Sequence, residues 1–475
     1  MLELKILPYE FKCPKRETLH SGSEKLFRYF PPDSPPTTKS TPVSSAHGKI
    51  KTLVFTIPEY CKVRAYNLLP IIEEVTLKMQ NTVQEIIIIH TGEKMKKLLA
   101  LKKKFHPKPQ IHLVKTNDID KNLDVWAQDH FYPLKVQENE QDFIYWAIGS
   151  IDSGDSSTLT RLNTFQTRSN TLEKVKVKKT GLPFEGGNIL AGEDFLLVGI
   201  SDHDFYYKQW FGLEPIFVGY DMPNVKTKFG KKQAFKDGFY NQLPPLKHTK
   251  SRRETTLGQP LLHIDMFITL AGYNDDRTAY TIVVGAPQIT PQVRTNADSD
   301  LLDALDHWLQ QMKESINTCI QKLEKDLSSK LNVPINVAKI PLILSYKDRI
   351  TPKKQHRQWF WVAYNNCLVE ITEATNSSVK TKQVWFPSYG SPSSDYSSIS
   401  MSARKQKNIR KKLEIDDSSR VIEHGNWTNL KYYDEAAAAK WSTLGFKVCC
   451  LEESYIPLIW RRGGLNCITN VIERL

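Results

Sequence analysis

A cysteine near the end of the chain, Cys467, has the surroundings of a nucleophile. It lies in RRGGLNCITN (residues 461–470), shortly after the glycine pair Gly463–Gly464. Two adjacent glycines indicate a tight turn at which the backbone can approach a ligand closely. Structural cysteines, in contrast, are usually buried in strands or helices. The turn therefore favours a reactive thiol, which needs other groups of the chain to activate it.

Four more short segments place polar side chains next to apolar residues and glycine turns. They are VWAQDH (125–130), PFEGGNIL (183–190), LLHIDMF (261–267) and VWFPSYG (384–390). The residues of the first three that could carry chemistry are Trp126, Asp129, Glu185, Asn188, His263 and Asp265. Each residue taken alone has a structural explanation that we favour, such as a turn aspartate or a buried core histidine. Their occurrence together with Cys467 favours one common site.

His263 and Asp265 are two residues apart in an extended apolar segment. In a strand, this spacing puts both side chains on the same face. A buried histidine and a buried carboxylate each need a partner, because an unpaired polar group in the interior is costly. We therefore expect an inward-facing pair on one strand.

In this order, the segments resemble the guanidino-group-modifying enzymes of the pentein family. This family includes agmatine deiminases, arginine deiminases, amidinotransferases and peptidylarginine deiminases. Its shared pattern is Trp-x-x-Asp, a turn of the Glu/Gly-Gly/Asn type, His-x-Asp and a glycine-rich turn before a nucleophilic cysteine. The chain carries this pattern at Trp126 and Asp129, Glu185–Asn188, His263 and Asp265, and Gly463–Cys467. The resemblance covers about residues 49–475 and implies an α/β fold, the five-fold pseudo-symmetric pentein propeller, with surface insertions.

The resemblance implies a hydrolase that converts a guanidine to a urea and releases ammonia. Cys467 would attack the guanidinium carbon and form a covalent thiouronium adduct. His263 would act as general acid and then as general base. Asp129 and Asp265 would bind the planar, cationic guanidinium, whose N–H groups pair well with carboxylates.

The resemblance also implies the remaining substrate-binding residues. Glu185 would hold His263 in place, and Asn188 would stabilise the turn that carries it. Trp126 would pack on the aliphatic stem of the substrate. The expected substrate-binding set is Trp126, Asp129, Glu185, Asn188 and Asp265.

Two details favour the peptidylarginine deiminases among these enzymes. Gln128 precedes Asp129, as in their Trp-x-Gln-Asp motif, and NCITNV resembles their Cys-x-Thr-Asn-Val. Asn466, however, stands where most relatives have histidine before the nucleophile. We expect a protein-arginine deiminase. An agmatine or free-arginine deiminase, an amidinotransferase, and an inactive relative that binds a cationic peptide or nucleic acid remain as alternatives.

Calcium is the metal to consider, because vertebrate peptidylarginine deiminases need it. Their calcium ligands include acidic residues just after the Trp-x-Gln-Asp motif. Here Asp129 is followed by His130, Phe131, Tyr132 and Pro133, none of which has a carboxylate. Calcium prefers several oxygen ligands, mostly carboxylates. We therefore expect no metal ion, no cofactor and activity without calcium.

Apolar patterns predict alternating strands and helices that position these segments. Strands are expected over 51–58, 84–92, 111–117, 278–287, 359–372, 382–387 and 447–453, and a hairpin over 188–201. Helices are expected over 95–105, 298–327 and 432–446. Two basic, polar stretches, 226–256 and 388–417, are expected as surface insertions. Residues 1–48, rich in proline, serine and threonine, are expected as a flexible leader before one catalytic domain over 49–475.

The composition fits a folded globular protein of 475 residues, with 40% hydrophobic residues. The net charge of +13 favours anionic surfaces, but no nucleic-acid motif is present and solvated lysine faces explain the charge better. The seven scattered cysteines argue against a disulfide framework and a zinc site. They indicate a reducing compartment, so we expect a cytoplasmic protein without a signal peptide or membrane span. Its expected partner is an arginine-containing protein or a small guanidine, and nucleic-acid contact is not expected.

Overall fold

The computed structural model of the chain describes residues 33–58, 68–92, 95–116, 123, 125–149, 170–202, 204, 206–221, 247–250, 256–261, 263–295, 299–350, 355–373, 380–390, 422–424, 430–453, 455, 458 and 463–475. Most of the two expected insertions, 226–246 and 391–417, and residues 1–32 of the expected leader lie outside these described residues.

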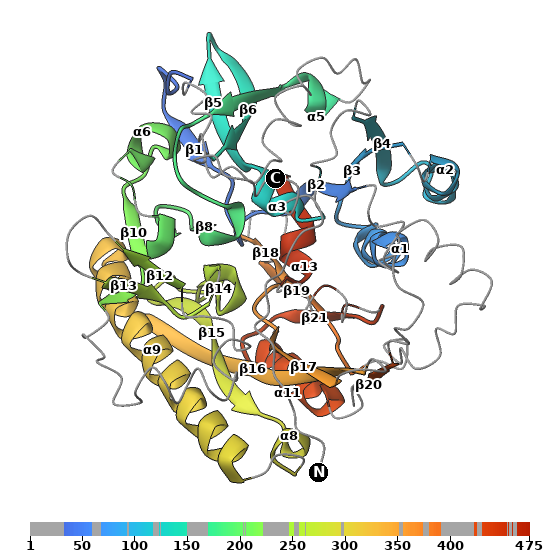
Figure 1. The fold of residues 1–475 in the computed structure, drawn as a ribbon. Coiled ribbons are helices and arrows are strands. Elements are labelled where there is room, and N and C mark those ends of the chain that lie inside the picture. The colour runs from blue at the N-terminus through green and yellow to red at the C-terminus, as the bar shows by residue number, and fades with distance from the viewer. Residues whose placement is uncertain are drawn as a thin grey trace, which may run out of the picture.

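One pattern of strand pairing recurs in five sheets of the described part. Two strands pair antiparallel, a helix follows, and a third strand returns parallel to the second. A parallel return needs a crossover connection, and a helix supplies it. Figure 1 shows α1, α6, α9 and α11 toward the outside and the short helices α3 and α13 nearer the middle. The mixed α/β class expected from the sequence is therefore confirmed.

Four of the five units follow one another between Tyr132 and Leu451. The first is β5 (Tyr132–Glu138), β6 (Gln141–Ile148), α5 (Asn170–Glu173) and β7 (Val175–Lys179). The second is β8 (Ile189–Ala191), β9 (Leu196–Gly199), α6 (Tyr207–Phe211) and β10 (Pro215–Val218). The third is β14 (Ile268–Tyr273), β15 (Tyr280–Ile289), α8 (Pro291–Thr295), α9 (Ser299–Leu331) and β16 (Ile335–Ile350). The fourth is β18 (Leu368–Thr372), β19 (Thr381–Pro387), α11 (Lys431–Thr443) and β21 (Lys447–Leu451).

The fifth unit joins the two ends of the described chain. It contains β22 (Thr469–Arg474), β2 (Ile50–Ile57), α1 (Leu68–Met79) and β3 (Glu85–His90), followed by α2 (Met95–Lys104) and β4 (Gln110–Lys115). β22 pairs antiparallel with β2, and Val471 lies opposite Leu53. This pairing fixes the segment around Cys467, which directly precedes β22, against the start of the domain.

Further strands extend these sheets. β17 (Gln355–Ala363) and β20 (Ile422–His424) both pair with β16. β11 (Tyr220–Asp221), β12 (Lys247–Lys250) and β13 (Thr256–Gln259) form a separate small sheet. β12 therefore places part of the expected insertion 226–256 in a sheet.

Most elements expected from the sequence are confirmed, with one correction that concerns the site. The strands β2, β3, β4, β15, β19 and β21, the hairpin β8–β9 and the helices α2, α9 and α11 lie where they were expected. The single strand expected over 359–372 is wrong, because β17 ends at Ala363 and β18 begins at Leu368. Between them the chain turns, and the Asn365 amide donates to the Val283 carbonyl 2.9 Å away.

The expectation of a flexible leader is wrong for residues 40–48. β1 (Ser40–Pro42) pairs antiparallel with β5, and Val43 and Ala46 are buried. The Arg474 guanidinium donates to the carbonyls of Ser45, Ala46 and Gly48 at 2.8–3.2 Å. The proline- and serine-rich composition misled the prediction, because these backbone groups find partners that composition does not reveal.

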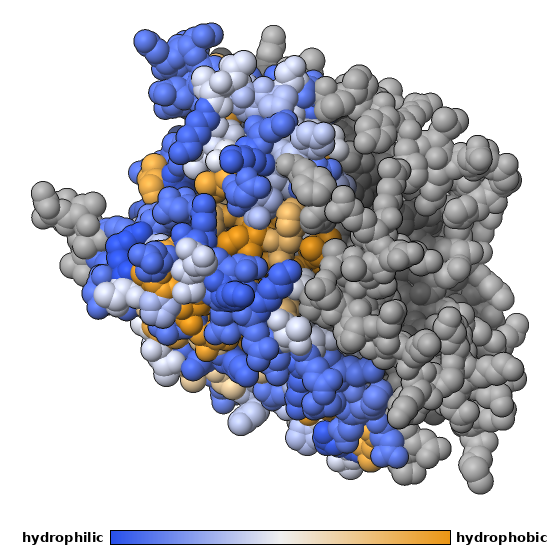
Figure 2. All heavy atoms as spheres, turned by 90° about the vertical axis from the view of Figure 1, so that its left-hand side faces the viewer, coloured by the Kyte–Doolittle hydropathy of each residue, from blue (hydrophilic) through white to orange (hydrophobic). Residues whose placement is uncertain are grey.

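The longest helix, α9, packs one face on the sheet of the third unit. Its buried residues recur three or four positions apart: Leu305, Leu309, Met312, Ile316, Ile320, Leu323 and Leu327. Figure 2 shows the face of the molecule on this side, where hydrophilic residues cover most of the described surface and some hydrophobic side chains gather near the centre. Within the described residues, no helix is both long enough and apolar enough to cross a membrane.

The packing of the segment before residue 49 can be tested by placing a charge in it. We expect Val43→Asp to lower the free energy of unfolding by about 3 kcal/mol, because it buries a carboxylate where Val43 is 3% exposed. Lys39→Asp, at an exposed neighbouring position, is the control and should change it by less than about 0.5 kcal/mol. Urea unfolding followed by tryptophan fluorescence measures both. Equal midpoints for the two variants would contradict a packed segment.

Candidate active site

The candidate residues lie on the turns that immediately precede the first strand of each unit. α3 (Ala127–His130) precedes β5, the 3₁₀ turn η4 (Gly186–Asn188) precedes β8, η6 (Ile264–Met266) precedes β14, and α13 (Leu465–Ile468) precedes β22. In the fourth unit the turn 364–367 precedes β18. α3 packs against α13 and η4, and η4 packs against η6. Equivalent positions of successive units therefore bring side chains from distant parts of the sequence together.

Cys467 lies beside Asp265 and an asparagine that the sequence analysis did not select, Asn366. The Cys467 thiol is 3.9 Å from Asp265 Oδ2 and 3.0 Å from Asn366 Nδ2. Asp265 Oδ2 also accepts hydrogen bonds from Asn366 Nδ2 at 2.8 Å and from Asn466 Nδ2 at 3.0 Å. Cys467 and Asp265 are 2% and 1% exposed, so these contacts are formed away from bulk water.

His263 is held by two carboxylates. Its Nε2 atom lies 2.6 Å from Glu185 Oε2, and its Nδ1 atom lies 3.9 Å from Asp129 Oδ1. Asp129 also accepts a hydrogen bond from the Gly187 backbone N–H at 3.3 Å. The histidine side chain is 4% exposed, whereas the Asp129 and Glu185 side chains are 19% and 25% exposed. The accessible part of the site is therefore on the side of these two carboxylates.

His263 and Asp265 do not share one face of a strand, which corrects the expectation. His263 has extended backbone, and Asp265 lies in the 3₁₀ turn η6 that follows it. The turn directs His263 toward Glu185, while Asp265 meets Asn366 and Asn466. The two residues therefore belong to one site but reach different partners, an outcome that strand periodicity does not predict.

The glycines of the site leave space for side chains of other turns rather than for a ligand. A Cβ atom on Gly463 would lie 2.3 Å from the Trp126 ring, and one on Gly464 would lie 2.8 Å from Asn366 Oδ1. A Cβ atom on Gly187 would lie 2.5 Å from His263 Nδ1. Only glycine allows these turns to pack so closely. The glycine turn, at which close approach of a ligand was expected, instead packs against neighbouring turns, and the Cys467 thiol is buried.

Asn188 is fully buried and is hydrogen-bonded to groups of three other segments. Its amide donates to Asp202 at 2.8 Å, and its oxygen accepts from Gln259 Nε2 at 2.9 Å and from the Ile264 backbone N–H at 3.2 Å. Asn188 therefore connects the turn of Glu185 with the turn of Asp265. This agrees with the turn-stabilising role expected for it.

The segment VWFPSYG (384–390) is not part of the site. The Ser388 hydroxyl and the backbone N–H groups of Tyr389 and Gly390 all donate to the Asp434 carboxylate, at 2.6–2.9 Å. These bonds anchor α11 to the end of β19. The glycine and polar residues of segment 384–390 thus stabilise the fold. The turn at Asn366 supplies the site residue of the fourth unit. The adjacent asparagines Asn365 and Asn366 were the missed signal, since asparagine favours turns.

Burial and mutual charge set the protonation of the site. Burial raises the pKa of Asp129 to about 7 against the opposing effect of His263, and it raises the pKa of Asp265 to about 6. Burial lowers the pKa of His263, but Asp129, Cys467 and Glu185 outweigh it, and the net pKa lies well above the ordinary value. Burial and the Asp265 charge raise the pKa of Cys467 to about 12. Near neutral pH the histidine is therefore cationic and the thiol protonated.

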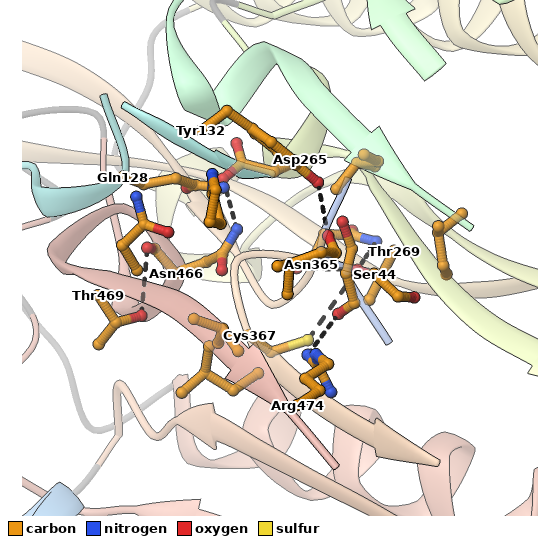
Figure 3. A pocket seen from close by; sticks show the side chains of 18 of the residues that line it. Ser44, Gln128, Tyr132, Asp265, Thr269, Asn365, Cys367, Asn466, Thr469 and Arg474 are labelled. Carbon is orange, nitrogen blue, oxygen red and sulfur yellow. Dashed lines mark hydrogen bonds between the residues drawn. The ribbon is translucent and has the colours of Figure 1, made fainter. Parts of the chain in front are cut away.

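A small polar cavity of about 40 Å³ lies behind Asp265 (Figure 3). Asp265 Oδ1, Gln128 Oε1, Asn365 Oδ1 and Arg474 Nε belong to residues that line it, and none of these atoms has a hydrogen-bond partner in the described part. The volume suffices for a few water molecules, and the mixture of acceptors and a donor suits water. One oxygen of Asp265 is thus committed to Asn366 and Asn466, while the other has no partner among the residues that the structure describes.

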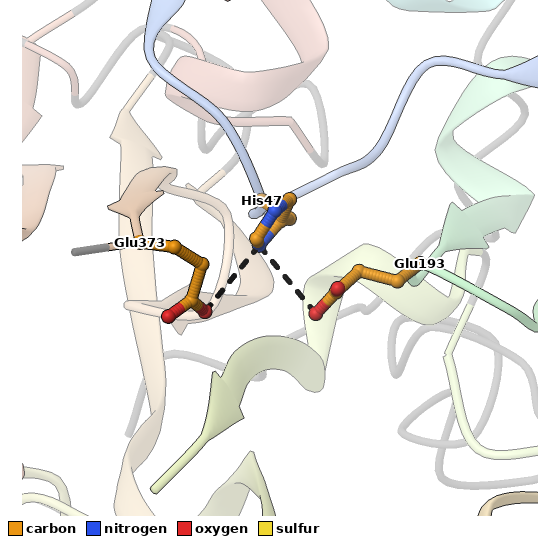
Figure 4. Close-up of side chains that lie close together, drawn as sticks. All are labelled: His47, Glu193 and Glu373. Carbon is orange, nitrogen blue, oxygen red and sulfur yellow. Dashed lines mark ion pairs between the residues drawn. The ribbon is translucent and has the colours of Figure 1, made fainter. Parts of the chain in front are cut away.

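Outside the site, His47, Glu193 and Glu373 lie close enough together to hold a metal ion (Figure 4). His47 Nδ1 is 3.5 Å from Glu193 and 3.9 Å from Glu373. The Arg277 guanidinium, however, lies 3.2 Å from Glu193 and 3.4 Å from Glu373, and Lys380 is 3.7 Å from Glu373. Because these two cations already compensate the carboxylates, we assign no metal to this cluster.

The comparisons with known proteins give structural neighbours only. No protein-family model and no curated protein sequence matches the chain. Among solved structures, it is similar to the agmatine deiminase of Enterococcus faecalis, with 12% identity, a TM-score of 0.48, and coverage of 93% of this chain and 99% of that one. The C. jejuni agmatine deiminase has 13% identity, a TM-score of 0.44, and coverage of 91% and 95%. DDAH from Pseudomonas aeruginosa has 11% identity, a TM-score of 0.34, and coverage of 89% and 99%.

The buried carboxylate of Asp265 should make stability depend on pH in a defined direction. Its pKa is about 6 in the folded chain and about 3.9 in the unfolded chain, so the unfolded chain releases the proton first as the pH rises. The contribution of Asp265 to folding is therefore most favourable below pH 4 and is lost as the pH rises toward 6. We expect the stability of Asp265→Asn relative to the wild type to increase by up to about 3 kcal/mol between pH 4 and 6. Urea midpoints of both proteins over this range give the difference, and a decreasing difference would contradict the shift.

Proposed function

We propose that the protein is a hydrolase that converts a guanidine to a urea and releases ammonia through a covalent adduct on Cys467. The single observation that carries this proposal is the placement of a thiol, a cationic imidazole and two aspartates, Asp265 buried and Asp129 partly exposed, close to one another. Cys467 contacts Asp265, and His263 lies 3.9 Å from Asp129. A guanidinium provides the positive charge and the N–H donors that this arrangement of carboxylates requires.

Binding of the guanidinium neutralises the two aspartates. Each carboxylate accepts N–H groups from one edge of the plane, which fixes the plane so that the central carbon faces the sulfur. Trp126 packs on the aliphatic stem of the substrate, as the sequence motif implies.

In the first half-reaction, Cys467 forms the C–S bond. The bound cation removes the repulsion between the Asp265 charge and a thiolate, which is part of what raises the pKa of Cys467 to about 12. The thiol releases its proton to water when the cation binds, and the resulting thiolate attacks the guanidinium carbon and gives a neutral tetrahedral adduct. The His263 imidazolium donates its proton to one terminal nitrogen of the adduct. The C–N bond then breaks, ammonia departs, and a thiouronium adduct remains on Cys467.

In the second half-reaction, the now neutral His263 takes a proton from water. The hydroxide adds to the thiouronium carbon, and the second tetrahedral adduct collapses with cleavage of the C–S bond. Cys467 departs as a thiolate and takes up the proton of the added hydroxyl group, which restores the thiol and releases the neutral urea product. Glu185, 2.6 Å from His263 Nε2, holds the ring through both proton transfers.

The substrate is protein-bound arginine or a small guanidine such as agmatine or free arginine. The described site residues address the guanidinium group, which all three share, so the geometry fits them equally. The repeated hairpin, helix and parallel strand support a five-fold pentein arrangement of the units. Five cysteines of the described part are free, which supports a reducing, cytoplasmic setting in which a nucleophilic thiol stays reduced.

The nucleophile is tested by Cys467→Ala. We expect turnover to fall by about a thousandfold or more, because no other group replaces the sulfur in the covalent step. Ammonia release and a colorimetric assay for the ureido product measure it on agmatine, free arginine and an acylated arginine peptide side by side.

Cys449→Ala is the matched control, since Cys449 is a half-buried thiol on β21 that should leave activity within about twofold of the wild type. Ammonia release by Cys467→Ala at the wild-type rate would exclude the covalent mechanism. Absence of ureido product from all three guanidines with the wild-type protein would remove the proposed activity.

The expectation of metal-free activity has its own test. We expect the wild-type rate on the best of the three substrates to change by less than about twofold after exhaustive chelation, since the clamp consists of protein carboxylates. The same measurement with added calcium completes the comparison. A large, saturable increase with calcium would show that an ion organises the site.

A further inference from the structure

Asn366 occupies the one site-forming turn to which the proposed mechanism assigns no chemistry. The turns before β5, β8, β14 and β22 carry Asp129, Glu185, the His263–Asp265 pair and Cys467. The turn before β18 carries Asn366, which is fully buried. Its position in the fourth unit is thus equivalent to that of the other site residues.

The hydrogen bonds of Asn366 determine which way its amide faces. The Cys467 backbone N–H, which can only donate, lies 3.1 Å from Asn366 Oδ1. The amide oxygen must therefore face Cys467 N, and the NH₂ group must face the opposite way. There it lies 2.8 Å from Asp265 Oδ2 and 3.0 Å from Cys467 Sγ. With two N–H bonds available, the amide can donate to the carboxylate and to the sulfur at the same time.

We propose that Asn366 is a catalytic residue that donates one N–H to the Cys467 sulfur and stabilises the thiolate during attack and departure. This inference rests on the proposed function for its role in turnover, but the interaction with the sulfur exists without substrate. A neutral thiol is a weak acceptor, whereas a thiolate is a strong one. The bond therefore strengthens as negative charge develops, which is the requirement for lowering a barrier.

The same amide connects the nucleophile with the substrate clamp. Its other N–H holds Asp265 Oδ2, so the carboxylate and the sulfur keep a fixed separation through one rigid planar group. Gly464 allows this approach, because a Cβ atom there would lie 2.8 Å from Asn366 Oδ1. The turn before Cys467 is thus shaped around the asparagine.

A merely structural role for Asn366 would consist of its bond to the Cys467 backbone. The neighbouring Asn365 provides the comparison, because it is buried in the same turn and its amide donates to the Val283 carbonyl at 2.9 Å and to Thr269 Oγ1 at 3.2 Å. Neither of these two bonds reaches Cys467. Loss of either amide removes buried hydrogen bonds, but only loss of Asn366 removes a donor to the sulfur.

The test measures the ionisation of the thiol directly. The rate of Cys467 alkylation by iodoacetamide, followed by mass spectrometry of its peptide between pH 7 and 10.5, reports the thiolate fraction. For Asn366→Ala we expect a rise in the apparent pKa of about one unit, hence about tenfold slower alkylation at a given pH. In Asn365→Ala, Cys467 should be alkylated at the wild-type rate. Asn366→Asp, nearly the same shape but without N–H donors, should slow alkylation at least as much.

Turnover gives the second readout. We expect kcat to fall about tenfold or more in Asn366→Ala and to remain within about threefold of the wild type in Asn365→Ala. Thermal unfolding identifies a variant that fails to fold. If one of the two Asn366 variants fails to fold, the alkylation rate and kcat of the other variant test the inference. An unchanged alkylation profile in folded Asn366 variants would overturn the inference even if an active wild type supports the proposed hydrolase. If the alkylation profile shifts in the Asn366 variants but the wild-type protein converts no guanidine, the thiolate donor is retained and the hydrolase is rejected.

Discussion

The buried carboxylate of Asp265 is the interaction on which the site depends. A carboxylate that is 1% exposed is costly unless hydrogen bonds or opposite charge compensate it. Asn366 and Asn466 compensate one oxygen, which fixes the position of Cys467 because Asn466 is its neighbour and Asn366 holds its backbone. The other oxygen has no protein partner in the described part. This oxygen belongs to a residue that lines the small cavity beside Asp265, which suits water, so the fold tolerates a carboxylate that protein groups satisfy only in part.

The positions of these residues follow from the repetition of one unit. Each hairpin is preceded by a short turn, and the pairing of β22 with β2 brings the last turn of the chain into the same set as the earlier ones. Glycines at these turns let neighbouring side chains approach to distances that a Cβ atom would prevent. A residue such as Asn188, with bonds to Asp202, Gln259 and Ile264, then fixes one turn relative to the next. Geometry that spans more than 300 residues of sequence therefore rests on local contacts between turns.

The sequence allowed prediction of the residues with distinctive chemistry but not of Asn366 or of the tertiary contacts that complete the site. Cys467, His263, Asp129 and Asp265 stand out by type, and the structure brings them together. Asn366 was placed inside a strand, because the apolar residues of WFWVAYNNCLVEIT continue on both sides of its turn. The segment at Ser388–Gly390 had the expected glycine and polar residues, yet its partner Asp434 is a tertiary contact that no local pattern reveals. Local patterns identify reactive groups better than the partners that hold them.

In the proposed mechanism, the site residues of the free protein are in unproductive protonation states until a cationic substrate binds. Burial keeps Cys467 protonated and raises the pKa of both aspartates, while the same aspartates keep His263 cationic. A bound cation changes each of these terms in the productive direction: it favours ionised aspartates and a thiolate, and it makes the histidine a stronger acid. A neutral molecule of the same shape supplies none of these effects. Under the proposed function, the charge of the substrate is part of the catalytic apparatus, and selectivity for cationic guanidines follows from the electrostatics of the site residues as much as from the shape of the site.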